Sequence, residues 1–196
     1  MYTYRIDRLF PEFSLEAYHP GKDEIKRVSQ KDFKGKFLVL FFYQSDFDFV
    51  CPTELADLNR YAGEFKRLKA EVLAVSTDTP YSHKAWLTSE GLLEHLSFML
   101  AADHNGQISK ALGIYDEARG VAQRAAFIID PSNILRGVEM TSEHVGRNAV
   151  EILRKLQAVQ YVRQHTGEVC PASWNVGEAT LRPSVKFSGN ILEQLQ

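Results

Sequence analysis

A run of seven apolar residues at positions 37–43 (FLVLFFY) constrains the fold of this 196-residue chain more than any other feature. A continuous apolar run of this length, rich in aromatic side chains, is typical of a β-strand that is buried on both faces. The run is also the longest apolar stretch of the chain, and it is far too short to cross a membrane. We therefore expect a central strand in a helix-covered sheet and no membrane-spanning segment.

The remainder of the chain alternates between strand-like and helix-like patterns. Apolar residues recur every three or four positions from residue 51 to residue 68, which predicts an amphipathic helix. The patterns further predict strands at 72–76 and 98–100, helices at 80–87, 108–112 and 148–164, and a hairpin of 125–129 with 134–138 around the turn 130–133. This order predicts an α/β fold with a mixed central sheet flanked by helices. We expect one domain over residues 1–165 and an extended C-terminal arm over 166–196, where the periodicity fades.

The composition is that of an ordinary globular protein with no bias toward nucleic acid. The apolar fraction is 44% and the formal net charge is −2, so the basic excess of a nucleic-acid-binding domain is missing. The first residues carry charges where a signal peptide needs an apolar stretch, so we expect a cytoplasmic protein. The six histidines are scattered, with no pair at ligand spacing, so we expect no metal site.

Cys51 is one of two cysteines, and it lies between the predicted buried strand and the amphipathic helix. Pro52 fits the first turn of a helix, which places Cys51 at the helix N-terminus. The free N–H groups and the dipole there favour an anion, so the position suits a reactive thiolate. The alternative is that Cys51 is a small buried apolar residue, as free cysteines often are.

A local dithiol is excluded, because Glu54 occupies the position where thioredoxin-like redox sites carry their second cysteine. If Cys51 is oxidised to a sulfenic acid, the resolving thiol must come from elsewhere in the sequence. Cys170, in the predicted arm, is the available candidate. It must be brought to Cys51 either by the fold or by a second subunit.

Four segments together resemble the peroxiredoxins in order and spacing. They are residues 41–54 (FFYQSDFDFVCPTE), 76–86 (STDTPYSHKAW), 124–131 (RAAFIIDP) and 167–174 (GEVCPASW). The resemblance extends over roughly residues 5–192 and is strongest to the bacterial alkyl hydroperoxide reductase C-type (typical 2-Cys) branch.

This resemblance implies a thioredoxin-like fold, antiparallel homodimers and often a decamer ring of five dimers. It implies that the Cys51 thiolate attacks the O–O bond of hydrogen peroxide or an alkyl hydroperoxide. The resulting sulfenic acid is expected to condense with Cys170 of the partner subunit. A flavoprotein disulfide reductase or a thioredoxin-like protein is expected to reduce that disulfide, with no metal, haem or flavin in this chain.

The resemblance also assigns roles to three charged residues. Arg124 is expected to stabilise the thiolate and the peroxide oxygens, and Glu54 to orient Arg124 together with Arg147. A guanidinium beside a thiolate lowers its pKa and steadies charge that develops on oxygen. Without the resemblance, Arg124 is an ordinary cation at a hairpin edge and Arg147 an ordinary charge in a first helical turn. Trp86 and Trp174 are expected to be packing residues.

The chain departs from the family pattern at two positions of the active-site loop. Gln44 stands where the family usually has proline, and Asp48 where it has threonine or serine. An ionised Asp48 close to the sulfur would repel a thiolate and raise the pKa of Cys51. Alternatively, its carboxylate points away from the sulfur and caps free N–H groups at the helix start. The first interpretation predicts a higher pKa for Cys51 and slower peroxide turnover than is usual in the family.

Three functions therefore compete. The first is a thiol peroxidase. The second is a weakly active relative that serves as a chaperone holdase or redox scaffold, which the altered loop motivates. The third is a thiol–disulfide exchanger, against which the missing local dithiol argues.

Overall fold

The computed structural model describes residues 4–195, which divide into two compact units, Met1–Ala149 and Val150–Gln196. No helix in this part of the chain is both long enough and apolar enough to span a bilayer. The units are described in turn.

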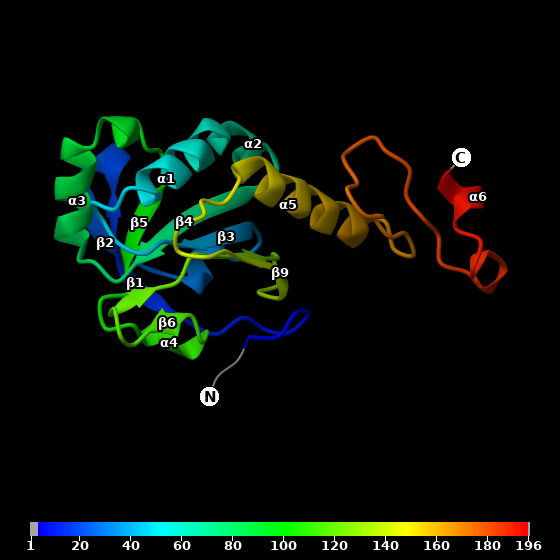
Figure 1. The fold of residues 1–196 in the computed structure, drawn as a ribbon, viewed down its shortest axis with the longest axis horizontal. Coiled ribbons are helices and arrows are strands. Elements are labelled where there is room, and N and C mark those ends of the chain that lie inside the picture. The colour runs from blue at the N-terminus through cyan, green and yellow to red at the C-terminus, as the bar shows by residue number, and fades with distance from the viewer. Residues whose placement is uncertain (1–3, 196) are drawn as a thin grey trace. The chain divides into compact units, whose positions relative to one another are not determined.

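A seven-stranded mixed sheet forms the centre of the first unit, in the order β2-β1-β5-β4-β3-β8-β9 (Figure 1). The strands are β1 (Ser14–His19), β2 (Glu24–Ser29), β3 (Phe37–Phe42), β4 (Ala70–Ser76), β5 (Met99–Ala102), β8 (Ala125–Ile129) and β9 (Leu135–Met140). β3, β4 and β5 are parallel to one another, while β8 is antiparallel to both β3 and β9. The predicted mixed sheet is therefore confirmed.

Helices cover both faces of this sheet, and Figure 1 shows α1 and α2 on one side and α4 on the other. The helices are α1 (Cys51–Arg60), α2 (Ala62–Arg67), α3 (Pro80–Ser89) and α4 (Gln107–Ala111). Three 3-10 turns accompany them, η1 (Pro20–Lys22), η2 (Gln30–Phe33) and η3 (Gly91–Leu93). A separate two-stranded sheet is formed by β6 (Tyr115–Asp116) and β7 (Val121–Ala122). All six residues of β3 are buried. Alternate residues of β3 (Leu38, Leu40 and Phe42) belong to the hydrophobic cluster that includes Ile108 and Leu112. The apolar run thus forms the predicted strand buried on both faces.

In the first unit, the main differences from the sequence predictions are an interrupted helix and a hairpin. The helix predicted over residues 51–68 is interrupted at Tyr61, which leaves helical geometry at φ −103° and ψ 14°. The hairpin of β1 and β2 was not predicted. Four of the six residues of β2 are exposed, so its sequence carries little of the apolar alternation that signals a strand.

The second unit consists mainly of α5 (Ala149–Gln164), followed by an irregular segment with η4 (Val185–Phe187) and α6 (Leu192–Leu195). Residues 168–182 are less extended than predicted, because a β-bridge between Val169 and Leu181 closes them into a loop. Trp174 lies inside this loop and is only 1% exposed, as expected for a packing residue. The predicted boundary between domain and arm at residues 165 and 166 stays a prediction.

Candidate active site

Cys51 lies directly after the loop that leaves the carboxyl end of β3, and it is the first residue of α1. Pro52 occupies the first turn of the helix, where a missing N–H group costs no hydrogen bond. The Cys51 side chain is fully buried, and its thiol is free of any disulfide. The local sequence therefore positions the sulfur as predicted.

Asp48 contacts both the helix start and the sulfur of Cys51. Its Oδ2 atom accepts hydrogen bonds from the backbone N–H groups of Cys51 (3.0 Å) and Val50 (3.3 Å). The same oxygen accepts a hydrogen bond from the Cys51 thiol, with an Sγ–Oδ2 distance of 2.8 Å. The two interpretations of Asp48 are thus not alternatives, because one oxygen atom caps the helix and faces the sulfur.

The guanidinium of Arg124 is the other charged group at the sulfur. A guanidinium has five N–H donors, and Arg124 makes five hydrogen bonds here. Its acceptors are the Glu143 carbonyl oxygen (2.7 Å), Cys51 Sγ (3.1 Å), Glu54 Oε2 (2.8 Å), Gln44 Oε1 (3.1 Å) and Asp48 Oδ2 (2.8 Å). Every donor of Arg124 therefore has a partner in this state, and an incoming oxygen must displace one of them.

Glu54 joins two arginines behind the sulfur. Its Oε1 atom accepts hydrogen bonds from the backbone N–H (2.7 Å) and Nε (2.9 Å) of Arg147. Its Oε2 atom accepts from Arg147 Nη2 (3.0 Å) and from Arg124. Arg147 also stacks on the ring of Phe41, 3.5 Å from the ring centroid. Neither arginine is a surface cation, since Arg124 is 1% and Arg147 6% exposed.

Comparison with known proteins identifies the family. The model of the AhpC/TSA family matches residues 6–138, and that of the C-terminal domain of 1-Cys peroxiredoxin matches residues 158–192. The chain belongs to the AhpC/TSA family. It is a peroxiredoxin, an enzyme of the thiol-dependent peroxidase class.

Individual relatives agree with this assignment. Alkyl hydroperoxide reductase C of Staphylococcus epidermidis is 43% identical over 95% of this chain and 98% of the relative, and its namesake of Escherichia coli K12 is 42% identical over the same shares. The crystal structure of Enterococcus faecalis AhpC is 42% identical and superimposes with a TM-score of 0.80, covering 85% of this chain and 98% of the other. The reduced 2-Cys peroxiredoxin of Plasmodium vivax is 31% identical, with a TM-score of 0.88 over 92% and 94% of the two chains. The predicted thioredoxin-like peroxiredoxin fold is confirmed.

The thiol of this peroxiredoxin is harder to ionise than its place at a helix start suggests. Burial has the largest effect on Cys51, and together with the hydrogen bond to Asp48 it raises the pKa of the thiol to about 11. The backbone N–H of Ser45 and the charge of Arg124 oppose this shift but do not overcome it. Asp48 thus acts on the pKa of Cys51 in the direction that the repulsion interpretation predicts, and Arg124 in the direction expected of it, while stabilisation of the thiolate and slower peroxide turnover stay predictions.

Asp48, by contrast, is held in its charged form. Burial tends to raise its pKa, but hydrogen bonds from Cys51 and Arg124 outweigh that effect and lower the pKa well below its usual range. A thiolate and a carboxylate 2.8 Å apart would repel each other by about 6 kcal/mol at an effective dielectric constant of about 20. The short contact is thus explained by one proton that lies between sulfur and carboxylate.

Cys170 belongs to the second unit, where it is half-buried beside the C-terminal half of α5. Its sulfur lies 3.9 Å from the carbonyl oxygen of Ala158. Burial raises the pKa of this thiol, the nearby Glu168 carboxylate adds to the effect, and Arg154 opposes it. Cys170 is thus also a protonated thiol at neutral pH.

A buried polar cluster under the active-site loop was missed in the sequence. The Asp46 carboxylate accepts a hydrogen bond from the Tyr43 hydroxyl (2.8 Å) and lies 2.9 Å from Nδ1 of His83 in α3. Trp86, one turn further along α3, contacts both Tyr43 and Phe47 through their rings and is 1% exposed. The cluster fixes the loop to α3. One sequence signal could have pointed to this cluster: Asp46 and His83 both lie in segments that resemble the peroxiredoxins, residues 41–54 and 76–86.

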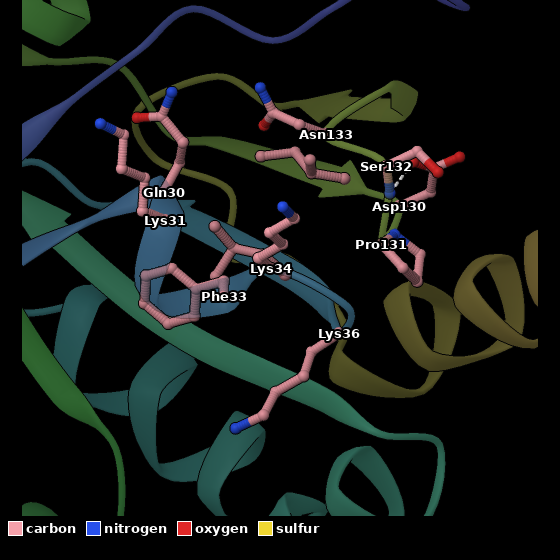
Figure 2. Close-up of a pocket in the computed structure, with 11 residues that line it drawn as sticks. Gln30, Lys31, Phe33, Lys34, Lys36, Asp130, Pro131, Ser132 and Asn133 are labelled. Carbon is pink, nitrogen blue, oxygen red and sulfur yellow. Dashed lines mark hydrogen bonds between the residues drawn. The ribbon is translucent and has the colours of Figure 1, made fainter.

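Two further observations on the described residues bear on whether another site could serve this activity. Within residues 4–194, no three His, Cys, Asp or Glu side chains lie close enough to hold a metal ion. A pocket of about 210 Å³ between the Phe33 and Lys34 segment and the β8–β9 turn is lined by Leu38, Ile129 and Asn133 (Figure 2). It adjoins the start of β3, whereas Cys51 follows the end of that strand. The pocket is therefore separate from the reactive sulfur.

Proposed function

We propose that Cys51 is the peroxidatic cysteine and that this enzyme reduces hydrogen peroxide and alkyl hydroperoxides to water and alcohols. The observation that carries the proposal is the buried sulfur with the Arg124 guanidinium 3.1 Å away. A guanidinium in a desolvated site stabilises charge on sulfur and on the departing oxygen. The names of the bacterial relatives, alkyl hydroperoxide reductases, support the same substrate class.

The polar residues around Cys51 either touch its sulfur or position a residue that does. Arg124 touches the reacting sulfur and is catalytic, whereas Glu54 acts through it by fixing the plane of its guanidinium. Arg147 holds Glu54 through three hydrogen bonds, so it acts one step further from the sulfur. Gln44 holds Arg124 Nη2 by its side-chain oxygen, a contact that a proline at this position cannot make.

The catalytic cycle is completed by Cys170 and an external reductant. The Cys51 sulfenic acid condenses with Cys170 of the partner subunit, which forms a disulfide and releases water. A flavoprotein disulfide reductase or a thioredoxin-like protein then reduces the disulfide. We further propose a cytoplasmic homodimer that assembles into a decamer ring, with the arm of residues 166–196 carrying Cys170. The scaffold alternative is not favoured, because the relatives are named as reductases.

Peroxide consumption with a generic dithiol as reductant tests the proposal. We expect turnover in the wild type and none in Cys51→Ser, because the nucleophile is lost. Arg124→Ala should lose at least about 100-fold in rate, the usual cost of removing a group that stabilises developing charge. Cys51→Ser activity equal to that of the wild type would disprove the assignment, as would peroxide consumption at background in the wild type.

A further inference from the structure

The Cys51 sulfur touches two charged side chains, and only one of them can accept a proton. Arg124 donates through Nη1 and has no acceptor atom. Asp48 accepts through Oδ2 at 2.8 Å. The third charged group of the site, Glu54, uses both carboxylate oxygens for hydrogen bonds with two arginines. Any proton that leaves the sulfur within this site therefore has Asp48 as its nearest acceptor.

We propose that Asp48 is a catalytic acid–base that takes the thiol proton of Cys51 during peroxide attack and returns it to the departing oxygen. The proposal rests on the proposed function, in which Cys51 is the nucleophile. It goes further because it explains how a buried thiol that still carries its proton can react with a peroxide. The usual threonine or serine hydroxyl of this loop position has no comparable basicity.

The step balances in atoms and electrons. Sulfur attacks the terminal oxygen of the hydroperoxide, so an S–O bond forms while the O–O bond breaks. As the S–O bond forms, the sulfur gives up an electron pair and becomes a far stronger acid than the resting thiol, so its proton moves to Asp48 Oδ2 in the same step, and the bonding pair of the O–O bond leaves with the other oxygen. Asp48 then protonates that oxygen, which yields an alcohol or water and a Cys51 sulfenic acid. Sulfur loses two electrons and the peroxide gains them.

Two features of the site suit Asp48 to this role. Its side chain is 23% exposed, whereas those of Arg124 and Glu54 are at most 1% exposed, so Asp48 lies at the side from which solvent and peroxide arrive. Protonation of Asp48 also removes the negative charge that holds Arg124 Nη2 at 2.8 Å. The same proton transfer therefore frees an Arg124 donor when charge develops on oxygen.

The decisive measurement is the pH dependence of single-turnover oxidation by hydrogen peroxide, followed by stopped flow. In the wild type the proton is shared within the site, so we expect a rate that is flat between pH 6 and pH 9. In Asp48→Asn the rate must follow the ionised thiol and rise about tenfold per pH unit. At pH 6 we expect this variant to be slower than the wild type by about 100-fold, within the usual range for general-base loss.

Control variants separate this role from charge alone. Asp48→Glu keeps a carboxylate and should restore the flat profile. Asp57→Asn removes a charge from the same helix, from a residue that pairs with Arg60 and accepts a hydrogen bond from the backbone N–H of Ala149, and should keep the wild-type profile. If Asp48 only repelled the Cys51 thiolate, Asp48→Asn would instead react faster than the wild type at pH 6.

Each outcome decides the proposal. A flat profile in Asp48→Asn, or a faster rate at pH 6, overturns the acid–base role while the peroxidase assignment stands. A wild type without peroxide-dependent oxidation of Cys51 overturns both. The sloped profile in Asp48→Asn with rescue by Asp48→Glu supports the role, because a merely structural residue would change the rate without changing its pH dependence.

Discussion

At the scale of single residues, five acceptors share the N–H donors of one guanidinium, that of Arg124. All five donors of Arg124 are engaged, and two of the acceptors, Gln44 and Asp48, stand at the positions where the resemblance implies a proline and a hydroxyl residue. The departures are therefore not independent of each other, since both side chains bind Nη2. Gln44 and Asp48 together hold Arg124 Nη2, a donor that the proposed reaction needs for the peroxide oxygens. The proposed reaction must therefore begin with the release of Nη2 from one of them.

The raised pKa of Cys51 predicts a loss of stability in alkali. The folded state holds the thiol proton more tightly than the unfolded state, whose thiol has the ordinary pKa of 9.0, against about 11 in the fold. The stabilisation is fully present below pH 9 and is lost as the pH rises through about 11. Two pKa units correspond to about 3 kcal/mol.

Urea unfolding under reducing conditions measures this effect. From pH 8 to pH 11 the free energy of unfolding of the wild type should fall by about 2 kcal/mol more than that of Cys51→Ser, since half of the folded thiols are still protonated at pH 11. The serine variant controls for every other group that titrates in this range. Parallel curves for the two proteins would mean that Cys51 ionises as easily in the fold as in the unfolded chain.

The position of Cys51 was predictable from sequence, whereas the dominant effect of burial on its pKa was not. Position depends on local signals, the buried strand before it and Pro52 after it. The pKa depends on burial and on Arg124, which is 73 residues away in the chain. A local pattern carries no information on how completely distant segments exclude water from a side chain.

At the scale of secondary-structure elements, the active-site loop is fixed between β3 and α3 by the cluster around Asp46. This cluster lies beside Phe47, whose backbone has a positive φ of 60° and whose ring contacts Trp86 of α3. The elements themselves were predictable because most are strongly patterned, as in the hairpin of β8 and β9. The hairpin of β1 and β2 was not, since only tertiary pairing with β5 makes its exposed sequence a strand.

Asp46→Ala should destabilise the fold substantially. It leaves the buried Tyr43 hydroxyl and the buried His83 ring without their carboxylate partner. Leaving a buried polar group without its hydrogen-bond partner costs about 1 to 3 kcal/mol, and Asp46→Ala affects two such groups. Lys36→Ala is the matched control, since its ion pair with Glu71 is about half exposed and is worth less than about 1 kcal/mol.

Urea unfolding at neutral pH measures both variants against the wild type. A loss below 1 kcal/mol for Asp46→Ala would show that the cluster does not hold the loop. Activity provides a second measure, because a loosened loop misplaces Asp48 and Cys51. The two losses should therefore occur together in Asp46→Ala and be absent in Lys36→Ala.

At the scale of the whole molecule, the two reactive thiols lie in different units. Cys51 begins α1 of the first unit, and Cys170 lies in the loop of the second unit that the Val169–Leu181 bridge closes. That loop is held by further contacts, because Glu168 accepts hydrogen bonds from Tyr161 (2.7 Å) and Thr180 (2.6 Å). The Cys170 thiol is therefore presented by a segment that several hydrogen bonds hold in place.

A mixing experiment tests whether the disulfide joins two chains. Cys51→Ser and Cys170→Ser chains, each with a different tag, are combined under conditions that allow subunits to exchange and are then treated with hydrogen peroxide. Each mixed dimer keeps one Cys51 and one Cys170 on opposite chains. We expect a covalent species that carries both tags on a non-reducing gel, and the dithiol reductant should dissolve it.

The controls give this result a single meaning. Neither variant alone can form the Cys51–Cys170 link, so neither should give a covalent species through this pair. A disulfide within one chain would instead make the wild type run as an oxidised monomer and would leave the mixture without the doubly tagged band. The intersubunit mechanism then fails, although Cys51 would still be the residue that reacts with peroxide.

Because ordered contacts hold the loop around Cys170, Glu168→Gln should also speed formation of the doubly tagged species by loosening that segment.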